Sequence, residues 1–123
     1  MPAEFDPIKF IRLAKDIGPN GGEAKQRCGI GRCYYGIFHM VRSKIGIPAG
    51  TSGAHQDVVN ALNAKEFRHL AQVYKSLLKL RKEADYELNP EHEFEDWDIN
   101  WSNSEMYTDT LLTMIAKLPA QAP

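Results

Sequence analysis

The chain has 123 residues, 43% of them hydrophobic and 25% charged, and a formal net charge of −1 at pH 7. These values are ordinary for a soluble globular protein, and the small net charge excludes a strong electrostatic field over the whole molecule. No apolar run approaches the roughly 20 residues that cross a bilayer, and no basic segment followed by an apolar one opens the sequence. We therefore expect one cytoplasmic domain over residues 1–123, with its core at about 5–118 and no membrane contact.

The charges are divided unevenly along the chain. Residues 1–83 carry 14 Lys and Arg against 7 Asp and Glu, whereas the remainder carries 1 against 9. This asymmetry permits a basic surface that faces an anionic partner. The alternative is that the acidic part only neutralises the rest.

A first helix is predicted after Asp6, which can cap it, with Pro7 at the first helical position. Phe5 and Phe10 have the spacing of a hydrophobic staple, in which a residue before the cap packs on the first turns. Gly18 is expected to end this helix, and the cluster at residues 19–22 is expected to form a turn.

Helical periodicity then continues from Glu23 to about Ile45. Three glycines in this helix each cost about 1 kcal/mol relative to alanine, which favours close packing against another helix or subunit. Gly36, beside Arg32 and His39, could instead leave room for a ligand. The apolar stripe, expected in the core, consists of Ile30, Tyr34, Ile37, Phe38, Val41 and Ile45.

Two further helices follow a break at residues 46–50. Thr51 or Ser52 can cap a short third helix, and a fourth is predicted from Glu66 to about Leu88, ended by Pro90. Apolar residues spaced three and four apart give the fourth helix a bundle seam. The expected buried positions are Val58, Val59 and Leu62 in the third helix and Leu70, Val73, Leu77, Leu80, Ala84 and Leu88 in the fourth.

The end of the chain is predicted to contain an acidic loop and a fifth helix. Residues 89–101 are acidic and aromatic, and Trp97 and Trp101 are expected to anchor them as a solvated loop. Ser102 to Glu105 has the capping-box pattern, which predicts that the fifth helix begins there. The complete pattern predicts an all-α protein, an antiparallel up-and-down helical bundle of four to five helices.

The polar stripe of the second helix is the first candidate site. Arg32, Tyr35, Gly36 and His39 share this stripe, so an always-charged donor and a titratable base point the same way.

A second polar set belongs to the third and fourth helices. Arg81 and Asp85, four positions apart beside the seam, are expected to pair at the edge of the core, either as a structural clamp or as part of a site. Tyr34 or Tyr35 could be a further partner, and the hydroxyl of Tyr34 is expected to bond a group such as Asp85. His55 opens the third helix and is expected to cap or pack there, with contact to a ligand as the alternative.

The sequence predicts no metal site and no cofactor. Cys28 and Cys33 lie five positions apart on one predicted helix and point away from each other, so we expect free thiols. The carboxylates of residues 92–98 lack the glycine turn and the terminal glutamate of an EF-hand loop.

Three segments, in their order and spacing, resemble the HEPN family, and specifically the short stand-alone HEPN proteins of prokaryotes. The resemblance extends from about Glu23 to Leu118. The segments are Arg32-Cys33-Tyr34-Tyr35-Gly36-Ile37-Phe38-His39, then Ala54-His55, then Leu80-Arg81-Lys82-Glu83-Ala84-Asp85-Tyr86.

This resemblance implies a helical bundle that pairs into a homodimer and works beside a minimal nucleotidyltransferase or in a toxin–antitoxin or defence system. Catalytic members cleave RNA without a metal, using an arginine and a histidine from each subunit at the dimer cleft. Arg32 and His39, with six residues between them, match the family spacing and are the catalytic candidates. Tyr35, Gly36, His55, Arg81 and Asp85 are the candidates for ligand binding or an interface.

Three departures from the family pattern bear on catalysis. Cys33 follows the arginine where catalytic members usually carry a polar residue, and the motif lies on an early helix instead of a late one. Val41 stands where nucleotidyltransferase-controlled members can carry a modifiable tyrosine. We therefore expect a nucleotide- or RNA-binding or partner module, with a metal-independent endoribonuclease as the alternative.

Overall fold

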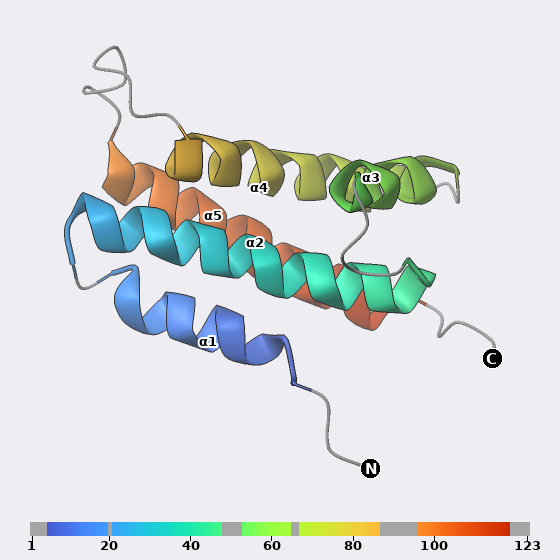
Figure 1. Ribbon diagram of the computed structural model, residues 1–123, viewed down its shortest axis with the longest axis horizontal. Helices are drawn as coiled ribbons and strands as arrows, with labels where there is room; N and C mark the ends of the chain where they lie inside the picture. Colours follow the sequence, from blue (N-terminus) through green and yellow to red (C-terminus); the bar gives the residue numbers. More distant parts are fainter. Residues whose placement is uncertain (1–4, 20, 48–52, 65–66, 87–95, 119–123) are drawn as a thin grey trace.

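The computed structural model describes residues 5–19, 21–47, 53–64, 67–86 and 96–118, which contain five helices and no strand. Figure 1 shows α2 and α5 running in one direction and α1 and α4 in the other, so the predicted all-α antiparallel bundle is confirmed. None of these helices is both long and apolar enough to span a bilayer. The helices are α1 (Ile8–Ile17), α2 (Glu23–Ile45), α3 (Ala54–Ala64), α4 (Arg68–Tyr86) and α5 (Trp97–Ala116).

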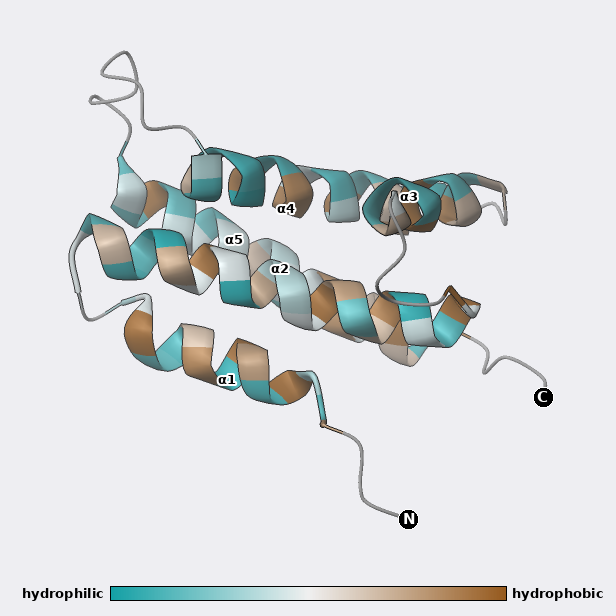
Figure 2. Cartoon of the chain, viewed as in Figure 1, coloured by the Kyte–Doolittle hydropathy of each residue, from teal (hydrophilic) through white to brown (hydrophobic). Residues whose placement is uncertain are grey.

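Helix α2 is the central element, because it packs against each of the other four helices. Its bounds agree with the periodicity of the sequence, and every residue of the predicted apolar stripe is buried. Gly46 ends it in the left-handed conformation, at φ 79°, where a side chain would be strained. Figure 2 shows α4 with hydrophilic residues on its outer side and hydrophobic residues toward α2.

The start of α1 follows the prediction in part, because the helix begins at Ile8 and Pro7 is its N-cap instead of its first residue. Asp6 accepts a hydrogen bond from the backbone N–H of Ile8 at 3.0 Å, and the rings of Phe5 and Phe10 lie 4.9 Å apart. Gly36 of α2 lies against α1, because a Cβ at this position would come within 2.6 Å of Ile11 Cγ1. Of the two explanations predicted for Gly36, the structure therefore supports close packing against another helix. It leaves no room there for a ligand.

One end of the bundle is packed around two tryptophans. Gly18 ends α1 with an ordinary right-handed backbone, so its lack of a side chain serves packing: a Cβ would lie 2.6 Å from the ring of Trp101. A Cβ at Gly29 of α2 would lie 2.9 Å from the same ring. Small residues therefore let α1 and α2 approach α5 closely. We call this region the tryptophan cluster; its members are Ala14, Ile30, Cys33, Ala84, Trp97 and Trp101.

The predicted start of the fifth helix is wrong. Helix α5 begins at Trp97, because the Asp96 side chain accepts hydrogen bonds from the two backbone N–H groups of Asp98 and Ile99. Trp97 and Trp101 are both buried, and residues 97–101 of the predicted loop belong to the helix. The Ser102–Glu105 capping-box pattern falls inside the helix and caps nothing.

The other predicted helix interiors agree with the structure. Val58, Val59 and Leu62 are buried in α3, and Leu70, Leu77 and Ala84 are buried in α4, whereas Val73 and Leu80 are only partly buried. The predictions for Thr51, Ser52, Glu66, Leu88, Pro90 and the first part of the acidic loop lie outside the described residues. Both cysteines are free, with Cys28 exposed and Cys33 buried.

Candidate functional site

Arg32 and His39 lie on one partly exposed edge of α2, as their spacing predicts, and they share two aromatic neighbours. The Arg32 guanidinium carbon lies 5.7 Å from the ring centroid of Phe10 and 5.5 Å from that of Tyr35. The His39 ring lies nearly parallel to the same two rings, with centroids 6.2 Å from Phe10 and 6.4 Å from Tyr35. The pair is thus arranged around Tyr35, with Phe10 contributed by α1.

Arg81 of α4 reaches the same edge from the other side of Tyr35. Only 9% of Arg81 is exposed, and its Nη2 donates to the hydroxyls of Tyr35 at 3.1 Å and Tyr86 at 3.3 Å. Its guanidinium carbon lies 5.7, 5.3 and 5.2 Å from the ring centroids of Tyr34, Tyr35 and Tyr86. The arginine is therefore held in a cage of tyrosines, which fixes its position behind the exposed edge.

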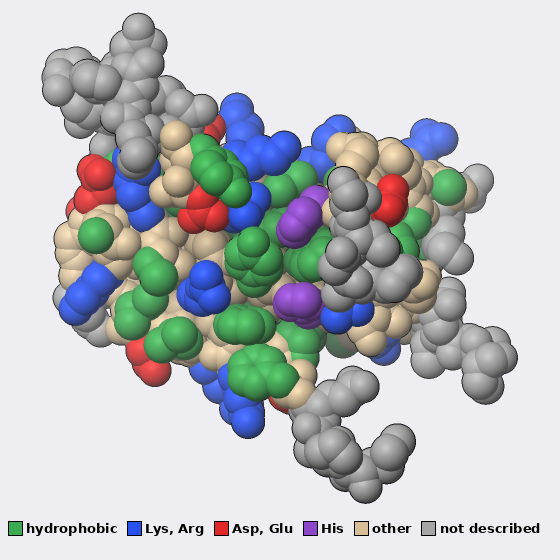
Figure 3. Space-filling model, in the orientation of Figure 1, with side chains coloured by type: hydrophobic (Ala, Val, Ile, Leu, Met, Phe, Trp, Pro, Cys, Tyr) green, Lys and Arg blue, Asp and Glu red, His purple; other side chains and the backbone are tan. Residues whose placement is uncertain are grey.

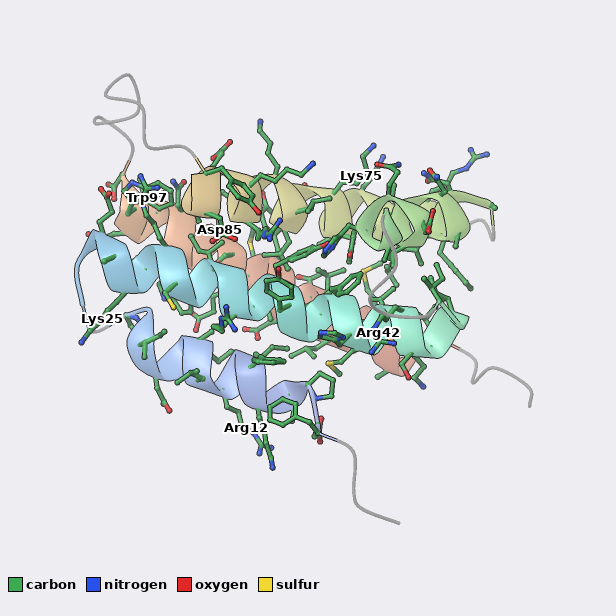
Figure 4. All side chains as sticks on the ribbon, viewed as in Figure 1. Arg12, Lys25, Arg42, Lys75, Asp85 and Trp97 are labelled. Carbon is green, nitrogen blue, oxygen red and sulfur yellow. The ribbon has the colours of Figure 1, made fainter. Side chains whose placement is uncertain are left out.

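The predicted pairing of Arg81 with Asp85 is confirmed. Arg81 Nε lies 2.9 Å from Asp85 Oδ2, but its N–H makes no hydrogen bond, so the contact is an ion pair without directed bonding. Asp85 also lies against Gly31, where a Cβ would be 3.4 Å from the carboxylate. Figure 4 shows Asp85 between α4 and α2, so this pair within α4 faces α2, where Asp85 lies against Gly31 and Arg81 bonds Tyr35.

His39 is held by a neighbour that sequence reasoning missed. Arg42 Nε donates to His39 Nδ1 at 3.0 Å, and Arg42 Nη1 reaches the carbonyl of Ile47 at 3.5 Å. Partial burial and the charge of Arg42 lower the pKa of His39 from its ordinary value. The imidazole is therefore neutral at pH 7, with its proton on Nε2, because Nδ1 accepts the bond from Arg42. The one donor of the neutral His39 ring is therefore its Nε2–H.

Behind this edge, a buried chain of hydrogen bonds joins α2, α3 and α4. Tyr34 Oη lies 2.8 Å from Tyr74 Oη and 2.5 Å from His55 Nδ1, and the His55 ring is stacked on Phe38 at 4.2 Å. We call Tyr34, His55 and Tyr74 the tyrosine network. The expectation that Tyr34 would bond Asp85 is wrong, because Tyr34 points into the core while Asp85 stays at its edge.

The tyrosine network is uncharged at pH 7. Burial raises the pKa of Tyr34 to about 12 and raises that of Tyr74 further, so both hydroxyls keep their protons. Burial and the charge of Arg81 lower the pKa of His55, so its imidazole is neutral at pH 7. Each of the two hydrogen bonds of Tyr34 therefore joins neutral groups. This places His55 primarily in packing, the first of the two roles predicted for it.

Three arginines gather at the edge described here. Within the described residues Arg32 and Arg42 form no ion pair, and the carboxylate of Asp85 is paired with Arg81. In Figure 3, basic and histidine side chains lie among hydrophobic ones across this side of the bundle. We call this surface the arginine–tyrosine face; it consists of Arg32, Tyr35, His39, Arg42, Arg81, Asp85 and Tyr86.

Sequence reasoning placed five of these residues and missed two. Arg42 follows His39 by three positions, a helical spacing that could have revealed the contact. Tyr86 follows Arg81 by five positions, which gives no such signal. Phe10 was expected only as a hydrophobic staple, since its contacts with α2 depend on how α1 docks.

No family model, curated protein or solved structure matches this chain. Among the described residues, no group of three or more His, Cys, Asp and Glu side chains is arranged to hold a metal ion. Function is therefore inferred from the geometry and charge of the arginine–tyrosine face itself.

Proposed function

We propose that this protein is a HEPN-like module that binds single-stranded RNA on the arginine–tyrosine face and holds it without cleaving it. The homodimer and the nucleotidyltransferase partner implied by the sequence resemblance belong to the same proposal. The observation that carries the proposal is the clustering of Arg32, Arg42 and Arg81 around an accessible tyrosine and a histidine, with Asp85 as their carboxylate neighbour.

The charge and shape of the face suit a nucleic acid. Arginine guanidinium groups bind phosphate through paired N–H donors, and aromatic rings stack on unpaired bases. Tyr35 is partly exposed beside Arg32, so a base on its ring would bring a flanking phosphate near that guanidinium, while the buried Arg81 holds the hydroxyl of Tyr35 in place. The neutral His39 offers an Nε2–H donor to the same ligand.

The hydrogen bond from Arg42 favours holding the RNA over cleaving it. A general base that activates a ribose hydroxyl needs a free, unprotonated ring nitrogen. In His39, Nδ1 is occupied by Arg42 and Nε2 carries the proton. Accepting a substrate proton would require the bond to Arg42 to break or the tautomer to change.

The second candidate function is metal-independent RNA cleavage. It is favoured by the shared surroundings of Arg32 and His39, because the charged donor and the titratable ring meet the same two aromatic neighbours. A metal-free mechanism needs a histidine for proton transfer and an arginine to stabilise the negative charge on the phosphorane oxygens. Both groups are present on the arginine–tyrosine face.

One experiment separates the two functions. Labelled single-stranded RNA is mixed with the protein in EDTA between pH 5 and 9, and both bound and cleaved RNA are measured. Arg32→Gln is compared with Arg68→Gln, and His39→Gln with His69→Gln, because Arg68 and His69 are exposed at the start of α4.

We expect wild-type binding without cleavage and a Kd raised about tenfold by Arg32→Gln, since a charged hydrogen bond to phosphate contributes about 1.5–3 kcal/mol. Arg68→Gln should leave the Kd within about twofold. Cleavage that Arg32→Gln and His39→Gln both abolish would establish the ribonuclease instead. Equal effects of the two arginine substitutions would remove the face from RNA binding altogether.

A further inference from the structure

The start of α1 carries an aromatic pair that the arginine–tyrosine face does not include. Phe5 is 59% exposed, and its ring lies 4.9 Å from that of Phe10, tilted by 54°. The ammonium of Lys9 lies 5.7 Å from the Phe5 ring centroid. The staple contact with Phe10 engages one side of Phe5, so the rest of a large apolar ring stays open to solvent beside a cation.

This pair continues the arginine–tyrosine face without a break. Arg32 lies over Phe10 at 5.7 Å and over Tyr35 at 5.5 Å, and Tyr35 is followed by Arg81 at 5.3 Å. Aromatic rings and guanidinium groups therefore alternate from α1 across α2 to α4. In Figure 3, the hydrophobic side chains along α1 lie next to the basic and histidine side chains of α2.

We infer that Phe5 and Phe10 form a base-stacking platform for a second unpaired base of the RNA, so that the ligand is an oligonucleotide and not a single nucleotide. This inference rests on the proposed function. Single-strand-binding proteins combine a basic path for the backbone with successive aromatic rings for the bases, and this row has that composition.

The charges around the platform agree with an anionic backbone. Lys9 and Arg12 are exposed on α1, and Arg32 stands between the platform and Tyr35. The nearby carboxylate of Asp6 accepts the backbone N–H of Ile8, which directs one of its oxygens toward the start of the helix. A positive group thus lies over each ring, Lys9 over Phe5 and Arg32 over Phe10.

The test compares uridine monophosphate with a single-stranded octauridylate, using Phe5→Leu, Phe5→Trp and the control Leu13→Ala. Leucine keeps an apolar group for the staple but removes the ring face, whereas tryptophan keeps the ring. Leu13 is 47% exposed on the same helix, so its substitution reports a general effect of lost apolar surface. Circular dichroism establishes that each variant remains helical.

We expect Phe5→Leu to weaken octauridylate binding about tenfold and to leave uridine monophosphate binding unchanged, while Leu13→Ala changes neither. Octauridylate should quench the fluorescence of Phe5→Trp more than that of the wild type, whose Trp97 and Trp101 are buried, and this readout holds even if Phe5→Leu unfolds. Wild-type affinity in a folded Phe5→Leu, or no quenching in Phe5→Trp, would overturn the platform.

The failure of the platform and that of the proposed function are distinguishable. If Arg32→Gln weakens octauridylate binding and Phe5→Leu does not, the arginine–tyrosine face binds RNA but the platform is wrong. If the wild type binds no RNA, both proposals fall. The fluorescence of Phe5→Trp could instead respond to anionic lipid vesicles and not to octauridylate. That result would mark a lipid-facing surface and overturn the inference.

Discussion

The tryptophan cluster and the tyrosine network are both buried, but they are built in opposite ways. The tryptophan cluster depends on shape, because Gly18 and Gly29 lie so close to the Trp101 ring that neither position can take a Cβ without movement. The tyrosine network depends on hydrogen bonds between Tyr34, Tyr74 and His55. The tryptophan cluster only holds helices together, whereas the tyrosine network also supports the polar groups of the arginine–tyrosine face.

The position of the arginine–tyrosine face follows from this difference. Arg81 lies over the rings of Tyr34 and Tyr35 at once, so the buried network and the exposed edge share one guanidinium. Because Tyr34 is fixed in the core, its ring also fixes the position of the Arg81 guanidinium. Substitutions that change one region at a time test how much each region contributes to the stability of the protein.

The largest effect is expected from Trp101→Ala. Removing a buried tryptophan side chain leaves a cavity between α1, α2 and α5, and such substitutions cost about 3–5 kcal/mol. Urea unfolding followed by circular dichroism measures the loss. Ile99→Ala, at an exposed position of the same helix, is the control and should cost under about 1 kcal/mol. A loss no greater than that of Ile99→Ala would contradict the role given to the tryptophan cluster.

An intermediate effect is expected from Tyr34→Phe. The substitution leaves the hydroxyl of Tyr74 and Nδ1 of His55 without their partner, and we expect a loss of about 2 kcal/mol in the free energy of unfolding. Tyr86→Phe is the matched control, because it removes a hydroxyl from an exposed tyrosine and should cost about 0.5 kcal/mol at most. Equal losses in the two variants would show that the network adds nothing to stability.

The smallest effect is expected from Gly31→Ala. A Cβ there makes only ordinary contact with Asp85, at 3.4 Å, so replacing glycine inside a helix should stabilise the protein by up to about 1 kcal/mol. Gly29→Ala, two positions earlier, should destabilise it, because its Cβ would lie 2.9 Å from Trp101 and 3.3 Å from Gly18 Cα. Thermal unfolding of both variants provides the comparison, and a shift of the same sign in both would contradict it.

Much of the fold could be predicted because helical periodicity is local. The buried stripe and the bounds of α2 follow from apolar spacing alone, as does the pairing of Arg81 with Asp85 four positions later. The start of α5 was missed because residues 89–101 are acidic and aromatic by composition, while burial of Trp97 and Trp101 decides where the helix begins. A capping box in the sequence cannot reveal that the helix has already begun.

The sequence by itself determined which side of α2 faces the core and that Arg32, Tyr35 and His39 share another side of that helix. Only the tertiary structure decided that Ile11 fills the space at Gly36, that Tyr34 bonds Tyr74 and His55, and that Phe10 lies beside Arg32. The physical reason is distance along the chain. Contacts within one helix follow from 3.6 residues per turn, whereas contacts between helices depend on how whole faces dock.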